Sequence, residues 1–476
     1  MKKIIIIISH FILVFALIIG IGCIPKKQNT SNKGFDGVLE EGVTIKVLEN
    51  DIAREQGYFK ELLEAFNEAY AEYGIEAVDA NMDESSDLIN DGPYGYGPDV
   101  LYQANDLIMT YVDGRHILPI SKDLINDSEL INENAWKAFA RTIDGTDYNF
   151  AVPVNVQTPL LYYRKDLLDQ YLPNWRTELD DNKDGICDIF QNMNDMYAFA
   201  KDFNEKNPGK YAFVCATNES YFMMGYLFSY GAYVFGDNDT NPDDIGVSSG
   251  ETYKGLNVIR QLSGVMPEGV TDGSIIQPAY GNLAKGIYFS TVTTPDVYTM
   301  FVTQLQNEFG KDVNVDDYLG AVTLPSLPVS GDLTEENPEL TDHVTMGGVH
   351  GYCISSYTES PDASLAFVNF ATNYDMIKRR NELLGISPAR TDVAEAVGGL
   401  SEIVNKELED GNIYIMPSIS AVKQLWTPMS SLFIDISTDA FREIKGQAVK
   451  YAKEFERVAA LEKAAKQIYD AIHTLQ

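Results

Sequence analysis

The order of predicted strands and helices near the start of the chain constrains the fold more than any other feature. Residues 43–47 alternate apolar and polar side chains, which predicts a strand. Residues 59–73 repeat apolar side chains at three- and four-residue spacing, which is typical of an amphipathic helix. Further strands are predicted at 75–80 and 100–102. A β-α-β-α-β order of this kind predicts an open parallel sheet covered by helices on both faces.

Polar side chains follow two of these strands at the point where each strand ends. Glu49, Asn50 and Asp51 come directly after the first strand, and Gln103 and Asp106 follow the strand at 100–102. Ligands of open α/β sheets bind outside the carboxyl ends of the strands. We therefore expect both clusters to face one ligand crevice.

Length and charge narrow the class of protein. The chain has 476 residues, which is too long for one compact core and favours two lobes. Its net charge is −34, and its 36 lysines and arginines form no dense basic stripe. Nucleic-acid binding is therefore excluded.

The first residues have the pattern of a secretory signal. Two lysines precede an apolar run at 4–22, and Cys23 follows small residues at its end. This junction resembles the lipobox of bacterial lipoproteins, in which the cysteine is lipidated, although Gly20 stands where leucine is usual. The alternative is an uncleaved anchor, because this run of 19 residues, interrupted by Ser9 and His10, nearly reaches the ~20 needed to span a bilayer. We expect residues 23–40, rich in polar side chains, to be a flexible linker.

The rest of the chain predicts a second unit. A strand is expected within 148–158, another at 210–216, and a sheet-and-helix unit over about 156–345. The glycine-rich stretch 342–361 is interpreted as a crossover between lobes, and residues 401–476 as mainly helical. The three cysteines after Cys23 do not make a disulfide framework, so we expect the core to stabilise the fold.

Short motifs along the mature chain resemble those of the extracellular solute-binding proteins of ABC sugar importers, the maltose-binding-protein group. They occur in the family's order, and none is specific alone: "GPDVLYQANDLIMTYVDGRHILPI", "AVPVNVQTPLLYYRKDLL", "TNESYFMMGYLFSYGAYVF", "LAKGIYFSTVTTPDVYTM", "GAVTLPSLP", "SPDASLAFVNFATN", "GISPAR" and "IYIMPSISAVKQLW". The resemblance implies a periplasmic-binding-protein-like α/β fold, in which two lobes joined by crossover hinge strands close on a ligand. It also implies that the N-terminal lobe comprises 41–155 and about 350–398, and the C-terminal lobe 156–349 and about 399–476.

The resemblance also implies binding residues. Trp426 falls on a tryptophan that stacks on a sugar ring, Asp106 on a carboxylate that binds sugar hydroxyls, and Glu219, Tyr221 and Phe222 on a Glu-x-Tyr-Phe cluster. Aromatic rings suit the apolar faces of sugars, and carboxylates suit their hydroxyl edges. Tyr221, Phe222 and Trp426 can equally be core aromatics.

Three positions depart from the family pattern. Gln103 replaces a tryptophan, Gln157 a glutamate, and Asp296 a stacking tryptophan, for which Tyr298 is expected to compensate. The loss of two aromatic platforms argues against assigning maltodextrin and favours another or a shorter oligosaccharide held by hydrogen bonds.

An acidic loop has the spacing of a calcium site. The segment "DDNKDGICD" fits the first nine positions of an EF-hand-type loop, which predicts a structural Ca²⁺ with these ligands: Asp180, Asn182, Asp184, Ile186 and Asp188. The twelfth position is Gln191 in place of the bidentate glutamate, so the alternative of a solvated acidic loop stays open. No other cofactor is expected to be required.

Catalytic motifs are weak. The segment "GVSSG" at 246–250 matches G-x-S-x-G by letters but follows an acidic loop sequence instead of a buried strand. The histidines have no zinc spacing. A membrane-tethered glycoside hydrolase, which needs two opposed carboxylates, remains the alternative among 70 acidic residues. We predict a non-enzymatic, monomeric carbohydrate receptor, anchored outside the membrane through Cys23, that delivers its ligand to an ABC permease.

Overall fold

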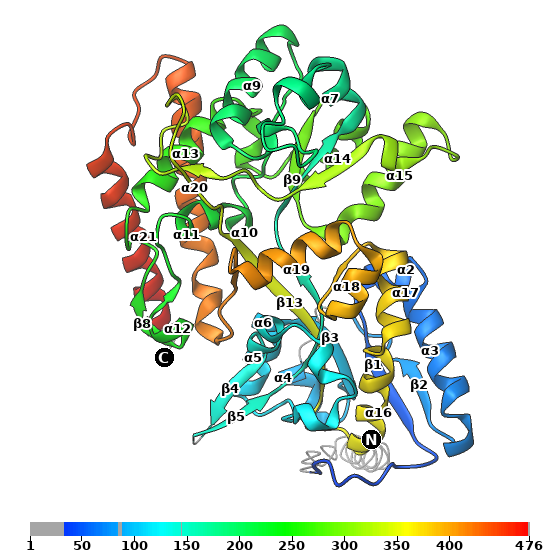
Figure 1. Cartoon of the computed structure of the whole chain (residues 1–476). Helices are drawn as coiled ribbons and strands as arrows, with labels where there is room; N and C mark the ends of the chain where they lie inside the picture. Colours follow the sequence, from blue (N-terminus) through cyan, green and yellow to red (C-terminus); the bar gives the residue numbers. More distant parts are fainter. Residues whose placement is uncertain (1–32, 84–87, 144, 475–476) are drawn as a thin grey trace, which may run out of the picture.

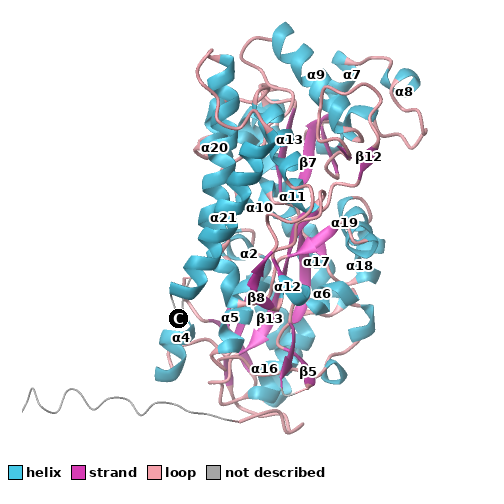
Figure 2. Ribbon diagram, turned by 90° about the vertical axis from the view of Figure 1, so that its left-hand side faces the viewer, coloured by secondary structure: helices cyan, strands magenta, loops and turns pink. Residues whose placement is uncertain are grey.

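The computed structural model describes residues 33–83, 88–143 and 145–474. The predicted signal at 1–22, Cys23 and most of the predicted linker lie outside the described residues. Two lobes are stacked along the long axis of the molecule, with strands in the interior and helices outside (Figures 1 and 2). None of the described helices combines the length and apolar character needed to cross a bilayer.

The N-terminal lobe is built on a seven-stranded sheet. The strands follow the order β14-β6-β13-β3-β1-β2, with β15 paired to β13. Their bounds are β1 Thr44–Leu48, β2 Glu76–Asp79, β3 Val100–Ala104, β6 Val152–Gln157, β13 Thr345–Ile354, β14 Ser387–Pro388 and β15 Ile413–Ile415. The predicted parallel arrangement is confirmed for β1, β2 and β3. It is wrong for β13, which runs antiparallel to β3 and β6, because the chain re-enters this lobe from the other one.

Helices from two segments of the chain, 51–137 and 361–410, surround this sheet. The predicted amphipathic helix is α3, Tyr58–Ala69, which buries Phe59, Leu62 and Phe66. The others are α2 Asp51–Glu55, α4 Leu88–Asp91, α5 Asn105–Asp113, α6 Glu133–Lys137, α16 Pro361–Ala371, α17 Tyr374–Leu384, α18 Thr391–Val397 and α19 Leu400–Asp410, with the hairpin β4 Ala140–Ile143 and β5 Thr146–Asn149. The described end of the predicted linker is fastened to α16, because the N–H groups of Asp36 and Gly37 donate to Asp362 at 3.1 and 3.0 Å.

The C-terminal lobe contains a three-stranded antiparallel sheet of order β10-β7-β9. These strands are β7 Leu160–Arg164, β9 Ser290–Thr293 and β10 Leu319–Val322. The helices of this lobe are α7 Lys165–Tyr171, α8 Trp175–Glu178, α9 Met193–Lys206, α10 Ser220–Met223, α11 Gly225–Phe228, α12 Gly236–Asp239, α13 Tyr253–Ser263, α14 Ile276–Ala284, α15 Tyr298–Phe309, α20 Trp426–Ile444 and α21 Glu454–Thr474. Short strands complete it: β8 Asn241–Ile245, β11 Leu327–Pro328 and β12 Leu340–Thr341.

Three local predictions need correction. The expected strand at 210–216 forms only a bridge and isolated backbone hydrogen bonds beside β9, such as that from Val292 N–H to the Val214 carbonyl at 2.9 Å. The acidic stretch taken as a loop is the exposed strand β8. The helical region after 401 is interrupted by β15, which pairs with β13 at the lobe junction. Cys187, Cys215 and Cys353 are buried and free.

Candidate functional site

The starts of α10 and α20 bring three of the predicted residues into one pocket. Glu219, Tyr221 and Trp426 line a cavity of about 520 Å³. The Ser220 hydroxyl donates to the Trp426 carbonyl at 3.1 Å, and the Ser430 hydroxyl donates to the Asn218 carbonyl at 2.6 Å, so side-chain to backbone bonds join the two helix starts. The pocket therefore offers an indole, a phenol and a carboxylate to one ligand.

Tyr221 links this pocket to the crossover strands. Its hydroxyl donates to the carbonyl oxygen of Gln157 at 2.9 Å, at the end of β6. Gly348 of β13 passes close by, because a Cβ at this position would lie 3.6 Å from the Tyr221 hydroxyl. The side chain of Gln157 in turn hydrogen bonds to Asp296. Tyr221, Gln157 and Asp296 thus meet where the lobes join.

The edge after β3 contributes Asp106 in the first turn of α5. Burial raises the pKa of the Asp106 carboxyl, and the Leu107 N–H and the Lys423 ammonium oppose this rise. Gln103 is half-buried on β3, opposite Gly351 of β13. Sequence reasoning places both residues at the crevice, and the structure puts them at the carboxyl end of a sheet strand.

Asn105 organises this edge and was missed by the sequence analysis. It is fully buried, its Nδ2 donates to the Met416 carbonyl at 2.9 Å, and its Oδ1 accepts from the Val349 N–H at 3.2 Å. A polar residue at a helix start gives no hint of partners 244 and 311 positions away. Asn105 therefore joins α5 to β13 and to the residue that follows β15.

The first polar cluster is mostly structural, which corrects its assignment to the ligand site. Glu49 is 1% exposed and forms a bidentate ion pair with Arg380 at 2.9 Å for both contacts. Asn50 caps α2 by accepting from the Ala53 N–H at 2.9 Å. Asp51 is exposed and pairs with Arg54 at 3.1 Å. Of the two carboxylates in this cluster, only that of Asp51 lies at the surface.

Two predicted aromatic contacts lie elsewhere. Tyr298 lines a separate groove of about 840 Å³ between α15 and the N-terminal lobe. It packs closely on Gly385, because a Cβ added to this glycine would lie 2.9 Å from the Cβ of Tyr298. Phe222 is half-buried and packs against the core, with its ring 6.1 Å from that of Tyr221. Neither residue lines the pocket of Trp426.

Asp296 lies near Tyr221 and near three tyrosines that the sequence analysis did not single out, Tyr102, Tyr162 and Tyr280. Burial raises the pKa of the Tyr162, Tyr221 and Tyr280 hydroxyls, and the Asp296 carboxylate adds to each rise. The Asp296 carboxylate also adds to the rise that burial causes in the pKa of Tyr102, a buried residue of β3. Tyrosines in the middle of apolar strands and helices give no sequence signal for this arrangement.

The predicted calcium loop is held by its own side chains. Asn182 Nδ2 and Gln191 Nε2 donate to Asp184 Oδ2 at 2.9 and 2.8 Å, and Gly185 N–H donates to Asp180 Oδ2 at 3.2 Å. Asp180 Oδ1 is buried without a partner. Burial raises the pKa of Asp188, and neighbouring carboxylates add to the rise. Within the described part of the chain, no group of three or more His, Cys, Asp or Glu side chains is placed to hold a metal ion.

The fold has two α/β lobes, the pocket of Trp426 lies between α10 and α20 of the C-terminal lobe, and the sequence assigns the family. The profile of the family described as bacterial extracellular solute-binding protein matches residues 51–376. The chain belongs to this family.

Individual relatives share the whole architecture. The maltodextrin-binding protein MdxE of Bacillus subtilis is 24% identical over 435 residues, which cover 89% of this chain and 90% of MdxE. The galactooligosaccharide-binding protein of the same organism is 22% identical over 74% of this chain and 75% of that protein. The structure of MalX from Streptococcus pneumoniae in complex with maltopentaose superposes with a TM-score of 0.67 at 20% identity, covering 90% of this chain and 100% of MalX. The predicted two-lobed fold and family are therefore confirmed.

Proposed function

We propose that this protein binds an oligosaccharide between its lobes and delivers it to the permease of an ABC transporter. The observation that carries the proposal is the pocket shared by Trp426, Tyr221 and Glu219, because it pairs aromatic faces with a carboxylate. The names of the relatives support the same ligand class, since they bind maltodextrin and galactooligosaccharides. We propose Asp106, Gln103, Gln157 and Asp296 as further ligand contacts. We also propose the lobe boundaries that the resemblance implies, except that residues 400–415 belong to the N-terminal lobe, because α19 packs on its sheet and β15 pairs with β13.

We also propose that Cys23 is lipidated after removal of residues 1–22, and that the monomeric receptor acts on the outer face of the membrane. The order of charged, apolar and small residues before Cys23 supports this proposal. Relatives in two strains of Streptococcus pneumoniae are named as maltooligosaccharide ABC transporter solute-binding lipoproteins.

Replacing Trp426 by alanine is expected to weaken oligosaccharide binding by about 2 kcal/mol, or roughly 30-fold, because aromatic anchors in pockets contribute most to binding. Isothermal titration calorimetry with maltotetraose and galactotetraose measures the effect. Trp175→Phe, which alters a buried tryptophan of α8, is the control and should leave affinity unchanged. Equal affinity of Trp426→Ala and wild type would remove Trp426 from the site.

Incubating the wild-type protein with the same oligosaccharides tests the alternative of a glycoside hydrolase. A receptor returns the oligosaccharide intact, whereas shorter product sugars, detected by chromatography, would favour the hydrolase.

The loop at 180–191 is proposed to take up a structural Ca²⁺ with ligands Asp180, Asn182, Asp184, Ile186 and Asp188. The orphaned Asp180 Oδ1 and the crowded carboxylates support a hard cation, since both features are relieved by positive charge. Millimolar CaCl₂ should raise the melting temperature of wild type and not of Asp184→Ala, because binding to the folded state stabilises it. A melting temperature indifferent to both calcium and chelator argues for a plain acidic loop.

A further inference from the structure

Three carboxylates of the proposed ligand site are not neutralised by an ion pair within the described part of the chain. Asp106, Glu219 and Asp296 form no ion pair among the described residues, and Glu219 instead accepts from the Asn218 amide at 2.9 Å. The nearest positive influence on Asp106 is Lys423, whose side chain is exposed. Asp106 and Asp296 both raise the pKa of Tyr221 after the larger effect of burial, so the two carboxylates act on one point. Burial raises the pKa of the Asp106 and Asp296 carboxyls, and no ion pair with another described residue balances the charge that these carboxylates carry when ionised.

Among the buried carboxylates away from the cleft, two are paired with a cation, and one, Asp362, is held by backbone N–H groups instead. Glu49 is matched by Arg380 at 2.9 Å, and Asp439, fully buried, is matched by Arg260 at 3.3 Å. Burying a charge without a partner costs free energy, which explains this pairing. Asp106, Glu219 and Asp296 thus lack, among the residues that the structure describes, the kind of cation that is paired with Glu49 and with Asp439.

Of the three carboxylates, Asp296 is the one with a buried oxygen that lacks a hydrogen-bond partner. Its Oδ1 is buried without a hydrogen-bond partner, and the side chains that hold the carboxylate, Thr294 and Gln157, are uncharged. The surrounding phenols of Tyr102, Tyr162 and Tyr221 carry no positive charge. A ligand that reaches this point when the lobes open can supply what the protein lacks, a hydrogen-bond donor with positive charge.

We propose that Asp296 makes the cleft select oligosaccharides by charge, with amino sugars bound above neutral sugars and acidic sugars excluded. This selection rests on the proposed function as an oligosaccharide receptor. An ammonium group gains a charge-assisted hydrogen bond at Asp296, a hydroxyl gains a neutral-donor bond, and a uronate carboxylate meets like charge from Asp106, Glu219 and Asp296.

The test compares one parent sugar in three charge states. Calorimetry with malto-, cello-, galacto- and mannotetraose identifies a neutral parent, and its 6-amino-6-deoxy and C6-carboxylate derivatives are then titrated at pH 6. We expect the amino derivative to bind at least about tenfold more tightly than the parent, and the carboxylate at least about tenfold more weakly. Binding of the carboxylate as tight as that of the parent overturns the selection. Binding of no neutral sugar overturns the proposed function, and the selection with it.

A charge-neutral variant assigns the effect to one residue. Asp296→Asn is expected to reduce the ratio of amino to neutral affinity about tenfold while it keeps the fold, which a melting curve checks. Asp202→Asn, on the exposed face of α9, where Asp202 pairs with Lys206, is the matched control and should keep the ratio of wild type. An unchanged ratio in Asp296→Asn overturns the role of Asp296, and the comparison of the three sugars on wild type stands even if this variant does not fold.

Discussion

Replacing Arg380 by methionine is expected to destabilise the protein by about 3–5 kcal/mol, because it leaves the buried Glu49 carboxylate without its cation. Both side chains of the pair are fully buried, and two contacts of 2.9 Å join them. The guanidinium also lies 3.9 Å above the ring of Tyr102, and Tyr352 donates to the same carboxylate. Methionine fills part of the volume but satisfies none of these groups.

Urea denaturation of Arg380→Met and wild type measures this loss. The adjacent Arg379→Met is the matched control, since Arg379 lies at the surface with Glu61 and Glu382 and its loss should change little. The double variant Glu49→Leu, Arg380→Met should recover most of the stability, because it removes the buried charges together. A double variant as unstable as Arg380→Met would show that packing, and not the unpaired carboxylate, sets the loss.

The same pair shows why sequence reasoning misread Glu49. The alternation of residues 43–47 correctly predicts a strand, and the break after it correctly predicts a polar edge. Nothing in that local pattern reveals an arginine 331 positions later on α17. The local sequence around a carboxylate at a strand end is therefore the same whether the carboxylate faces a ligand or a buried guanidinium.

Pairings between distant segments account for the other differences. The predicted crossover at 342–361 contains β13, but its antiparallel entry beside β3 depends on where the chain returns from the C-terminal lobe, which spacing cannot show. By contrast, Glu219, Tyr221 and Trp426, each of which lies in a motif of the family, line one pocket. Asn105, Tyr102 and Tyr162 also lie in motifs of the family, but a motif does not show which buried side chains meet, so only the structure reveals their contacts.

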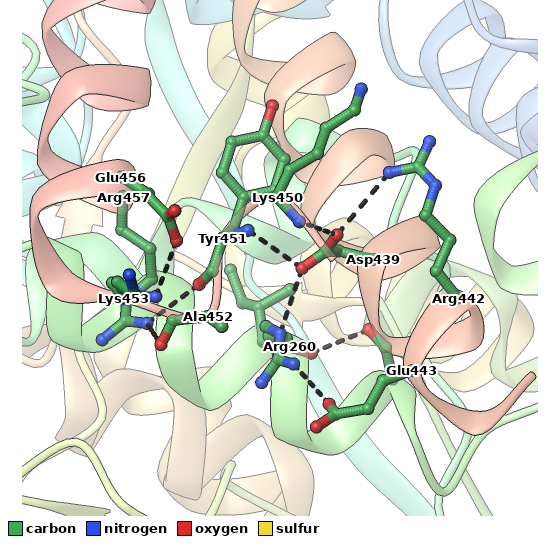
Figure 3. A network of polar contacts seen from close by, with 12 residues as sticks. Arg260, Asp439, Arg442, Glu443, Lys450, Tyr451, Ala452, Lys453, Glu456 and Arg457 are labelled. Carbon is green, nitrogen blue, oxygen red and sulfur yellow. Dashed lines mark hydrogen bonds and ion pairs between the residues drawn. The ribbon is translucent and has the colours of Figure 1, made fainter. Parts of the chain in front are cut away.

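A second buried carboxylate holds the loop between α20 and α21, which lie side by side along the C-terminal lobe (Figures 1 and 2). Asp439 is fully buried on α20 and accepts from the N–H groups of Lys450 and Tyr451 at 2.6 and 3.0 Å (Figure 3). Arg260 of α13 donates to the same carboxylate at 3.3 Å and also contacts Glu443. One side chain thus fixes the loop and neutralises a mostly buried guanidinium.

Asp439→Ala is therefore expected to cost about 3–5 kcal/mol, because it leaves Arg260 with only the exposed Glu443 as a partner and leaves two backbone donors without an acceptor. Glu443→Ala is the matched control, since it removes the exposed partner of the same arginine and should cost at most about 1 kcal/mol. Urea denaturation measures both, and hydrogen exchange should show faster exchange at the Lys450 and Tyr451 amides in Asp439→Ala alone. Equal stability of the two variants would mean that the exposed Glu443 suffices for Arg260, and that the loop is held by the packing of α21 instead of by Asp439.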